Sequence, residues 1–356
     1  MSADKYVAFD VHKASIYAVV RDHRGQIVCE SILKTLAEPV LDFLRGLGGR
    51  VWLTFEEGAQ ATWLYDLTDP IVDRVIVCNP RKNRSGPKEP KSDRIDARRL
   101  SEWLFLGTLK PVFHETSSVR RLKHLVRAYT QLVGDRARMK NRFRANFTAN
   151  AIESPGPLLY APTRRETWLA KLPKDGTRHR AEVMGRAIDA LTPIIVDSRR
   201  ALVAEVSRHP DYPIIDSLPG FGPVRSAILI GTIVTPYRFR RNRQLWTYAG
   251  LSVVMHTSSD HVIDAQGVRR QTTTSRTRGL TANYNRPLKD AFKGAASRAV
   301  RIEPFKQVFE HLIARGLSDS IARVVIARKL ASCALAIWKK GEHFDADRLM
   351  PNQVTR

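Results

Sequence analysis

The stretch KYVAFDVHKASIYAVVRD, residues 5–22, decides the fold of the N-terminal part of the chain. Its apolar, β-branched and aromatic residues predict two strands, separated by a short break at His12-Lys13-Ala14. Residues 25–33, GQIVCESIL, predict a third strand. Asp10 lies in the middle of the first strand, where a buried carboxylate is costly without a partner. Taken alone, such an acid is more often found at the end of a strand, in a turn.

Strands then alternate with helices up to residue 107. Apolar spacing predicts helices at residues 36–47, 60–71 and 91–107, and strands at 50–58 and 72–80. The last helix has a predicted apolar stripe of Ile95, Leu100, Trp103 and Leu104. Adjacent strands followed by alternating strands and helices indicate a mixed-sheet α/β domain, which we assign to residues 1–116.

A second domain, residues 117–212, is predicted to be all helical. Apolar residues recur at helical spacing over 122–143 and over 181–206, where Pro193 interrupts the pattern, and residues 157–168 between them are expected to be irregular. Two long basic helices indicate either an antiparallel hairpin or a coiled-coil dimer, and we favour the dimer.

A third, mostly α-helical domain is predicted for residues 213–356. Its segment SLPGFGPVRSAILIGTI, residues 217–233, has the glycine-rich turn and apolar helix of a helix-hairpin-helix, which can bind a phosphate through backbone N–H groups. The same pattern would serve equally well as a simple turn between helices. Residues 322–341 predict a further amphipathic helix.

The chain is strongly basic, with a formal net charge of +24 and an isoelectric point near 10.4. Such a charge makes DNA or RNA the expected partner, with an anionic membrane surface as the alternative. No apolar run of about 18 residues and no signal-peptide pattern is found, so we expect a soluble cytoplasmic protein and no membrane partner. The three cysteines have no metal-ligand spacing and are expected to be buried free thiols.

Four acids of the first domain could form one site. Glu56 ends a predicted strand and Glu57 follows it, so only one of the two can share a face with Asp10. Asp93 and Asp96 are three residues apart on a predicted helix and therefore share a face. Two carboxylates there repel unless a cation lies between them. That cation could be an arginine or a divalent metal ion, and two such ions about 4 Å apart support attack at a phosphodiester.

The sequence resembles the DEDD transposases of the insertion-sequence-110 family, which includes the Piv-type DNA invertase. The segments FDVHK, FEEG, CNP and KSDRIDARRLSEWL match its first domain, which is RNase H-like, of the Holliday-junction-resolvase kind. The segments SLPGFGPVRSAILI, RFRRNRQLWTYAGL, NRPLKDAFKGAA and ARKLASCALAIWKKG match its C-terminal transposase domain in the same order.

The resemblance implies roles for particular residues. Asp10, Glu56, Asp93 and Asp96 fall on the four metal-binding acids, with Glu57 as the alternative second acid and two Mg2+ ions as the implied cofactor. Ser258 falls on a serine nucleophile that would form a phosphoserine link to DNA, and Ser259 is the alternative. The resemblance also implies donor and target DNA, a structured non-coding RNA and a homo-oligomer, a dimer or tetramer, as partners.

The sequence departs from the family pattern around the serine. Val253 stands where the family often has a proline, and Asp260 follows Ser259 where a glycine is common. Further on, residues 283–285 read NYN where the family has Gly-Asn. Without the resemblance, HTSSDH at residues 256–261 would be read as an ordinary turn.

Three basic segments are candidates for nucleic-acid contact, because Arg and Lys pair with phosphates. Residues 81–91 form a predicted strand-entry loop, residues 238–246 combine Arg with Phe and Trp, and residues 267–279 predict a flexible loop. Their candidate contact residues are Arg81, Lys82, Arg84, Lys88, Arg238, Arg240, Arg241, Arg243, Arg269, Arg270, Arg276 and Arg278.

The sequence therefore predicts a DNA transposase or recombinase that cuts and exchanges strands through a covalent phosphoserine. A site-specific invertase would need the same chemistry. A junction-type nuclease using water, and a scaffold in which the acids only balance arginines, are the rival hypotheses. The metal hypothesis requires the carboxylates of Asp10, Glu56 and Asp96 to converge.

Overall fold

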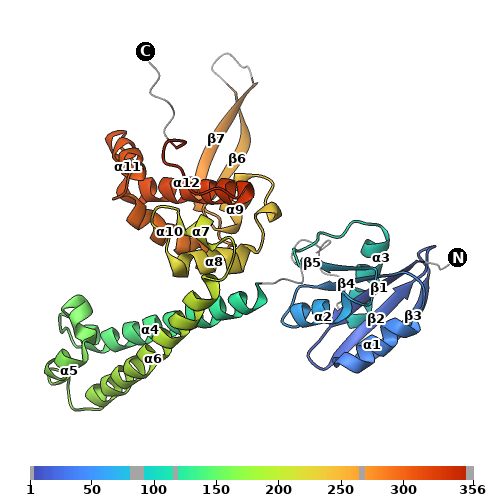
Figure 1. The fold of residues 1–356 in the computed structure, drawn as a ribbon, viewed down its shortest axis with the longest axis horizontal. Coiled ribbons are helices and arrows are strands. Elements are labelled where there is room, and N and C mark those ends of the chain that lie inside the picture. Colours follow the sequence, from blue (N-terminus) through green and yellow to red (C-terminus); the bar gives the residue numbers. More distant parts are fainter. Residues whose placement is uncertain (1–3, 81–91, 115–118, 264–268, 350–356) are drawn as a thin grey trace. The chain divides into compact units, whose positions relative to one another are not determined.

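The computed structural model describes residues 4–80, 92–114, 119–263 and 269–349, and the chain forms two compact units. The first runs from Met1 to Thr116 and the second from Ser117 to Arg356 (Figure 1).

The first unit is built on a five-stranded mixed sheet. Its strands, in chain order, are β1 Lys5–Val11, β2 Ser15–Arg21, β3 Ile27–Lys34, β4 Val51–Glu56 and β5 Arg74–Cys78. In space the order is β3-β2-β1-β4-β5, with β1, β2 and β3 antiparallel and β4 and β5 parallel to β1. The predicted mixed-sheet α/β arrangement of this part is thereby confirmed.

Three helices cover the two faces of this sheet. Helices α1, Ala37–Gly46, and α2, Ala61–Thr68, pack on the face that carries Val7, Phe9, Leu53 and Phe55. Helix α3, Asp93–Phe105, packs on the opposite face, where its leucines meet Ala8 and Cys78. Because strand residues alternate in direction, the even-numbered positions of β1, including Asp10, belong to the α3 face.

Helix α3 begins where the sequence predicts its acids. Ser92 is its N-cap, and the Ser92 hydroxyl accepts a hydrogen bond from the Ile95 N–H. The prediction that Ile95 joins a buried stripe was wrong, because Ile95 is 37% exposed. The buried face of α3 consists of Ala97, Leu100, Ser101 and Leu104, which turns the N-terminal acids toward the edge of the sheet rather than into the core.

The second unit contains a long helical hairpin. Helices α4, Arg120–Ala149, and α6, Thr177–Val206, lie side by side (Figure 1). The C-terminal end of α4 packs through Phe143 and Phe147 on Ala181 and Ile188 near the start of α6. Leu122 and Val126 at the start of α4 belong to one core cluster with Leu202 and Val206 at the end of α6. The two helices are therefore antiparallel within one chain.

Two expectations about this hairpin were wrong. Pro193 does not interrupt α6, a helix of 30 residues in total that runs on past the proline to Val206. Packing along α4 outweighs the backbone hydrogen bond that proline cannot make. Residues 157–168 are not irregular, since they contain most of a 3-10 turn, Gly156–Tyr160, and of helix α5, Pro162–Leu169. Pro162 takes the first helical position, where no intrahelical N–H bond is needed.

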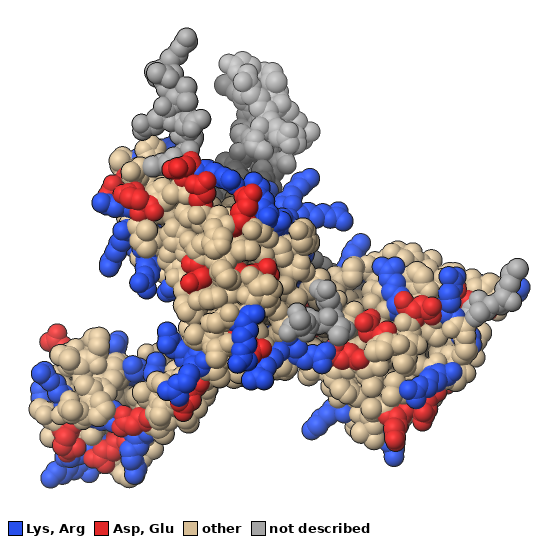
Figure 2. Space-filling view, in the orientation of Figure 1, with Lys and Arg blue, Asp and Glu red and all other residues tan. Residues whose placement is uncertain are grey.

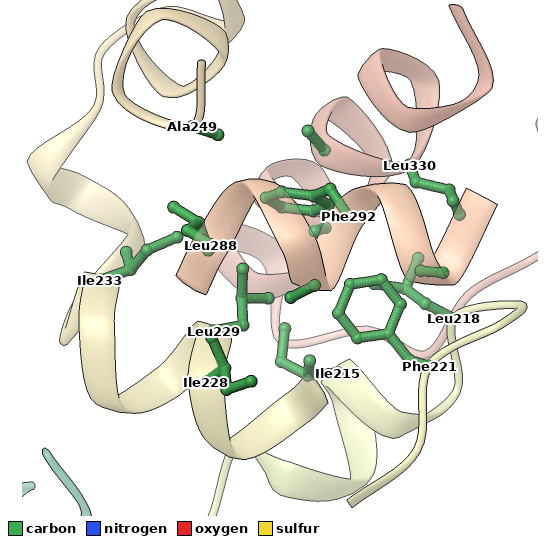
Figure 3. Close-up of a cluster of buried hydrophobic side chains, with 14 of the residues drawn as sticks. Ile215, Leu218, Phe221, Ile228, Leu229, Ile233, Ala249, Leu288, Phe292 and Leu330 are labelled. Atoms are coloured by element: carbon green, nitrogen blue, oxygen red, sulfur yellow. The ribbon is translucent and has the colours of Figure 1, made fainter. Parts of the chain in front are cut away.

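The remainder of the second unit is a globular, mostly helical body. Its helices are α7 Tyr212–Asp216, α8 Pro223–Ile233, the 3-10 turn Pro236–Arg238, α9 Asn242–Tyr248, α10 Arg286–Ala299, α11 Phe305–Ala314 and α12 Asp319–Lys340. Figure 3 shows Ile228, Leu229 and Phe292 among the side chains that fill the core between α8, α10 and α12.

A two-stranded antiparallel ribbon projects from this body (Figure 1). Strand β6, Val253–Ile263, pairs with β7, Arg269–Leu280. The alternative reading of a turn at 256–261 does not hold, and the prediction of a flexible loop was wrong for residues 269–279, while residues 267–268 lie outside the described residues. The reason lies in the Thr-rich run of residues 271–277, whose β-branched residues favour strands and find a partner of similar composition in β6.

The remaining expectations concern cysteines and membranes. All three thiols are free, but only Cys78 is fully buried, while Cys29 and Cys333 are partly exposed. Among the residues that the structure describes, no helix has the length and apolar character needed to span a membrane.

The glycine turn before α8 generates a stability prediction. Gly220 has φ +82°, and a Cβ there would lie 2.3 Å from the Ala295 carbonyl oxygen of α10. Gly316 has a similar φ of +84° but open space around it. Both Gly→Ala changes cost on the order of 1–2 kcal/mol of backbone strain. We expect Gly220→Ala to lower the free energy of unfolding by roughly 1–3 kcal/mol more than Gly316→Ala, because only Gly220 adds a backbone clash.

The measurement is urea denaturation followed by circular dichroism on both variants and the parent chain. Equal losses for Gly220→Ala and Gly316→Ala would show that the turn does not pack closely on α10.

Candidate active site

Two acids lie side by side at the ends of the central parallel strands. Phe9 of β1 is paired with Phe55 of β4, so the next residues, Asp10 and Glu56, occupy corresponding positions. Ala8 and Thr54 lie two residues before them on the same strands, on the face of the sheet that α3 covers. Because residues two apart on a strand share a face, Asp10 and Glu56 lie on the α3 face as well. Asp10 is half-buried, with 20% of its side chain exposed, whereas Glu56 is exposed at the strand end.

Glu57 takes a different position from Glu56. Its backbone N–H donates to the Cys78 carbonyl, which continues the ladder to β5. By alternation it belongs to the opposite face from Asp10, and its carboxylate lies 4.0 Å from His114 Nε2. Of the two candidates for the second acid, the geometry therefore favours Glu56.

The other two acids come from the first turn of α3. Asp93 and Asp96 follow the Ser92 cap, and the Asp96 N–H donates to the Ser92 carbonyl at 2.9 Å. Asp93 is exposed and Asp96 is half-buried. Both are close enough to Asp10 for their charges to act on its ionisation.

The electrostatics of Asp10 reflect this crowding. Burial raises the pKa of the Asp10 carboxyl above its usual value, and the charges of Asp93 and Asp96 raise it further. A hydrogen bond and the charge of His12 act in the opposite direction. Several carboxylates that disfavour each other's ionisation form a site whose charge is best neutralised by a cation.

His12 is the residue of this site that the sequence reasoning missed. Its Nε2 lies 3.1 Å from Asp10 Oδ2 and 3.2 Å from Asp93 Oδ1. The hydrogen bond with Asp10 is the largest cause of a raised His12 pKa. A signal was present in the sequence, because Asp10 and His12 are two residues apart at the end of a strand and such residues share a face.

Two of the arginines next to the α3 acids bind a different carboxylate. Arg94 Nη2 lies 3.0 Å from Glu30 of β3, and Arg98 Nη2 donates to the same carboxylate at 3.0 Å. The hydrogen bond from Arg98 is the first cause that holds the pKa of Glu30 below its usual value. The scaffold hypothesis, in which such arginines neutralise Asp93 and Asp96, therefore loses two of its candidate cations.

The donor set fits a divalent metal ion. One ligand atom from each of Asp10, His12 and Asp93 lies within 4.8 Å of the others. Glu56 and Asp96 are not part of this group, but the strand register places Glu56 next to Asp10, and the charge of Asp96 acts on Asp10. Hard divalent cations take carboxylate oxygens as their preferred ligands.

The predicted nucleic-acid contacts have mixed outcomes. Arg81, Lys82, Arg84 and Lys88 lie outside the described residues. Arg238 stacks on the Tyr248 ring at 4.5 Å and donates to the Thr232 carbonyl, which indicates a structural role. Arg240, Arg241 and Arg243 are exposed around the start of α9.

The ribbon carries the serine candidates and the last arginines. Ser258 is opposite Thr274, and Ser259 is opposite Thr273. Arg269, Arg270 and Arg276 lie on β7, the strand that pairs with β6. Arg278 follows on β7.

Comparison with known proteins identifies the class. Residues 7–149 match the model of the DEDD transposases of IS110, and residues 212–310 match the model of the IS116/IS110/IS902 transposase family. Both matched models describe transposases of one family. The chain belongs to the IS110 family of transposases. Family membership implies a divalent metal ion, which the donor set accommodates.

A curated relative agrees with this assignment. The insertion element IS110 uncharacterized 43.6 kDa protein of Streptomyces coelicolor is 25% identical over 155 residues. The aligned stretch covers 42% of this chain and 35% of the relative, so the chain spans about a third of the length of the curated relative it matches.

The contrast between Glu56 and Glu57 gives a binding prediction. A ligand present at 100 times its Kd that binds only the folded state adds about 2.7 kcal/mol to stability. We expect Mn2+ or Mg2+ to raise the Tm of the parent chain and of Glu57→Gln alike, and to raise that of Glu56→Gln much less. Differential scanning fluorimetry across a metal titration measures this. A larger loss in Glu57→Gln would assign the second acid to the other face of the sheet.

Proposed function

We propose that this chain is a DNA transposase that cuts and rejoins strands at the ends of an insertion element. The observation that carries the proposal is the grouping of acids from β1, β4 and α3 at one edge of one sheet in a strongly basic chain. Each acid alone has an ordinary structural explanation. The acids are grouped at the same end of the strands, and the neighbouring Arg94 and Arg98 bind Glu30 rather than these acids. This arrangement favours a site for metal and phosphate.

We infer an RNase H-like fold for the first unit. Three antiparallel strands followed by two parallel ones, with acids on the ends of β1 and β4, support this assignment. Helix α3 contributes the remaining acids from the same face. Thr54 lies buried below Glu56, and its hydroxyl donates to the Ile76 carbonyl at 2.7 Å, so the strand beneath the site is firmly held.

In this proposal Asp10, Glu56, Asp93 and Asp96 would hold two Mg2+ ions. A bound pair of such ions stabilises the charge on the attacking and leaving oxygens of a phosphodiester. The protein contributes the orientation of the carboxylates. Asp10 and Glu56 are fixed by the paired strands, and Asp93 and Asp96 by the Ser92 cap of α3.

The proposed nucleophile is Ser258. Its hydroxyl oxygen forms a bond to the phosphorus, the bond to the leaving strand breaks, and that strand end takes up a proton as a free hydroxyl. Ser258 is preferred to Ser259 because it falls on the serine position of the family that the matched segment resembles.

The proposed partners are donor DNA, target DNA and a structured RNA that supplies sequence choice. The charge of +24 supports polyanion binding. On the face that Figure 2 shows, Lys and Arg lie on the hairpin of α4 and α6 (the arm), on the helical body and on the first unit, spread out rather than gathered in one patch. A spread of this kind favours contact with extended backbones. Exposed Arg240, Arg241 and Arg243 are candidates for such contact.

Self-association into a dimer or tetramer is also proposed. The hairpin of α4 and α6 satisfies its apolar seam within one chain, so a coiled coil between chains must use another face. Helix α6 offers Val183 and Ile194, which are 38% and 50% exposed and, at eleven residues apart, lie on one side of the helix. Their exposure supports a second contact surface along the arm.

The test is covalent trapping. The full chain is incubated with Mg2+, RNA from the flanking element and labelled donor and target DNA, and a denaturant-stable protein–DNA adduct is sought. We expect an adduct with the parent chain and with Ser259→Ala, and at least a 100-fold loss with Ser258→Ala and with Asp96→Asn, because nucleophile and metal are each required.

The contrary results discriminate between the rival functions. Metal-dependent cleavage that persists in Ser258→Ala without any adduct would identify a nuclease that uses water. Binding without cleavage, unchanged in Asp96→Asn, would identify a nucleic-acid scaffold.

A further inference from the structure

The cluster of Asp10, His12 and Asp93 contains a nitrogen donor among the acids. We propose that His12 is a direct ligand of the divalent ion and that it makes this site prefer Mn2+ to Mg2+. The inference rests on the proposed metal site of the transposase and adds to it a residue outside the four acids. All the residues involved belong to the first unit.

The separations around His12 match those between neighbouring ligands of one ion. Its Nε2 is 3.1 Å from Asp10 Oδ2 and 3.2 Å from Asp93 Oδ1. Two ligands about 2.1 Å from an octahedral ion and at right angles to each other are roughly 3.0 Å apart. The three side chains need little rearrangement to share a cation.

A hydrogen bond from the His12 ring satisfies the two carboxylates less well than a bound metal ion would. The Nε2 atom carries at most one hydrogen, yet it faces a carboxylate oxygen on each of two sides. One N–H cannot point well at both acceptors, since hydrogen bonds weaken steeply away from linearity. A divalent ion bound to all three groups neutralises both carboxylates and uses the nitrogen lone pair.

The backbone holds His12 where the ring can act. The His12 N–H donates to the Ser15 carbonyl at 2.9 Å, which closes the turn between β1 and β2. The Thr35 hydroxyl donates to the His12 carbonyl at 2.9 Å. His12 is thus fixed from two sides, while 49% of its side chain remains exposed and accessible to an ion from solution.

A nitrogen ligand changes which metal is preferred. Mg2+ is suited to carboxylates, carbonyls and water, whereas imidazole is suited to transition metals. Mn2+ accepts carboxylate oxygens readily and, as a first-row transition-metal ion, also binds nitrogen ligands, so a mixed set of acids and one histidine favours Mn2+ over Mg2+. An all-acid site lacks this bias.

The experiment measures metal binding on the full chain without DNA. Mn2+ affinity is obtained from the loss of the free-ion electron paramagnetic resonance signal, and Mg2+ affinity from competition. We expect His12→Ala to weaken Mn2+ binding on the order of 10-fold or more, and Mg2+ binding by less than about 3-fold. Electron spin-echo modulation from a directly bound nitrogen should appear in the parent chain and disappear in His12→Ala.

The matched control is His23→Ala, which removes an exposed histidine from the turn between β2 and β3 of the same unit. Unchanged Mn2+ affinity in His12→Ala, or equal weakening of both ions, overturns the inference. His12→Gln separates folding from ligation, because it keeps a polar side chain and should still lose the nitrogen modulation.

Failure of the inference is distinguishable from failure of the proposed function. If the parent chain binds metal and Asp10→Asn abolishes binding while His12→Ala does not change it, only the role of His12 is lost. If the parent chain binds neither ion, the metal site of the proposed function fails, and the role of His12 fails with it.

Discussion

The parallel pairing of β1 with β4 is the constraint on which the candidate site depends. Its register, with Phe9 opposite Phe55, sets Asp10 beside Glu56 on one face and leaves Glu57 on the other. A slip of one residue would exchange the faces and separate the acids. Helix α3 completes the site from the same face. Arg21 Nε donates to Ser101 Oγ at 2.9 Å, and Arg98 binds Glu30, so two contacts tie α3 to β2 and β3.

This docking also explains why a chain of such positive charge retains closely spaced acids. Arg94 and Arg98 are used to anchor α3 on Glu30, and the low pKa of Glu30 reflects that use. Asp93 and Asp96 remain at the edge with Asp10, whose raised pKa reports crowding and burial. Arginine therefore positions the helix, and the proposed cation of the site is a metal.

The sequence was sufficient for the parts of the fold governed by local patterns. Runs of apolar and β-branched residues predicted the strands of the sheet, and apolar spacing over residues 91–107 predicted α3, whose first turn holds Asp93 and Asp96. It failed where partners distant in the chain decide the outcome. Residues 269–280 form a strand mainly because β6 pairs with them, and Pro193 is tolerated because α4 packs along α6. His12 was missed because its significance depends on Asp93, which is 81 positions away in the chain and reaches it only through the docking of α3.

Metal-directed cleavage of the backbone tests the convergence of these segments most directly. Fe2+ bound in place of the native ion, with ascorbate and peroxide, generates radicals that cut the chain near the metal. A single metal site built by β1, β4 and α3 predicts three groups of cuts in the full chain, around Asp10 to His12, around Glu56 and around Asp93 to Asp96, all suppressed by excess Mn2+. Cuts confined to one of these segments, or scattered and insensitive to Mn2+, would contradict a single metal site built by β1, β4 and α3.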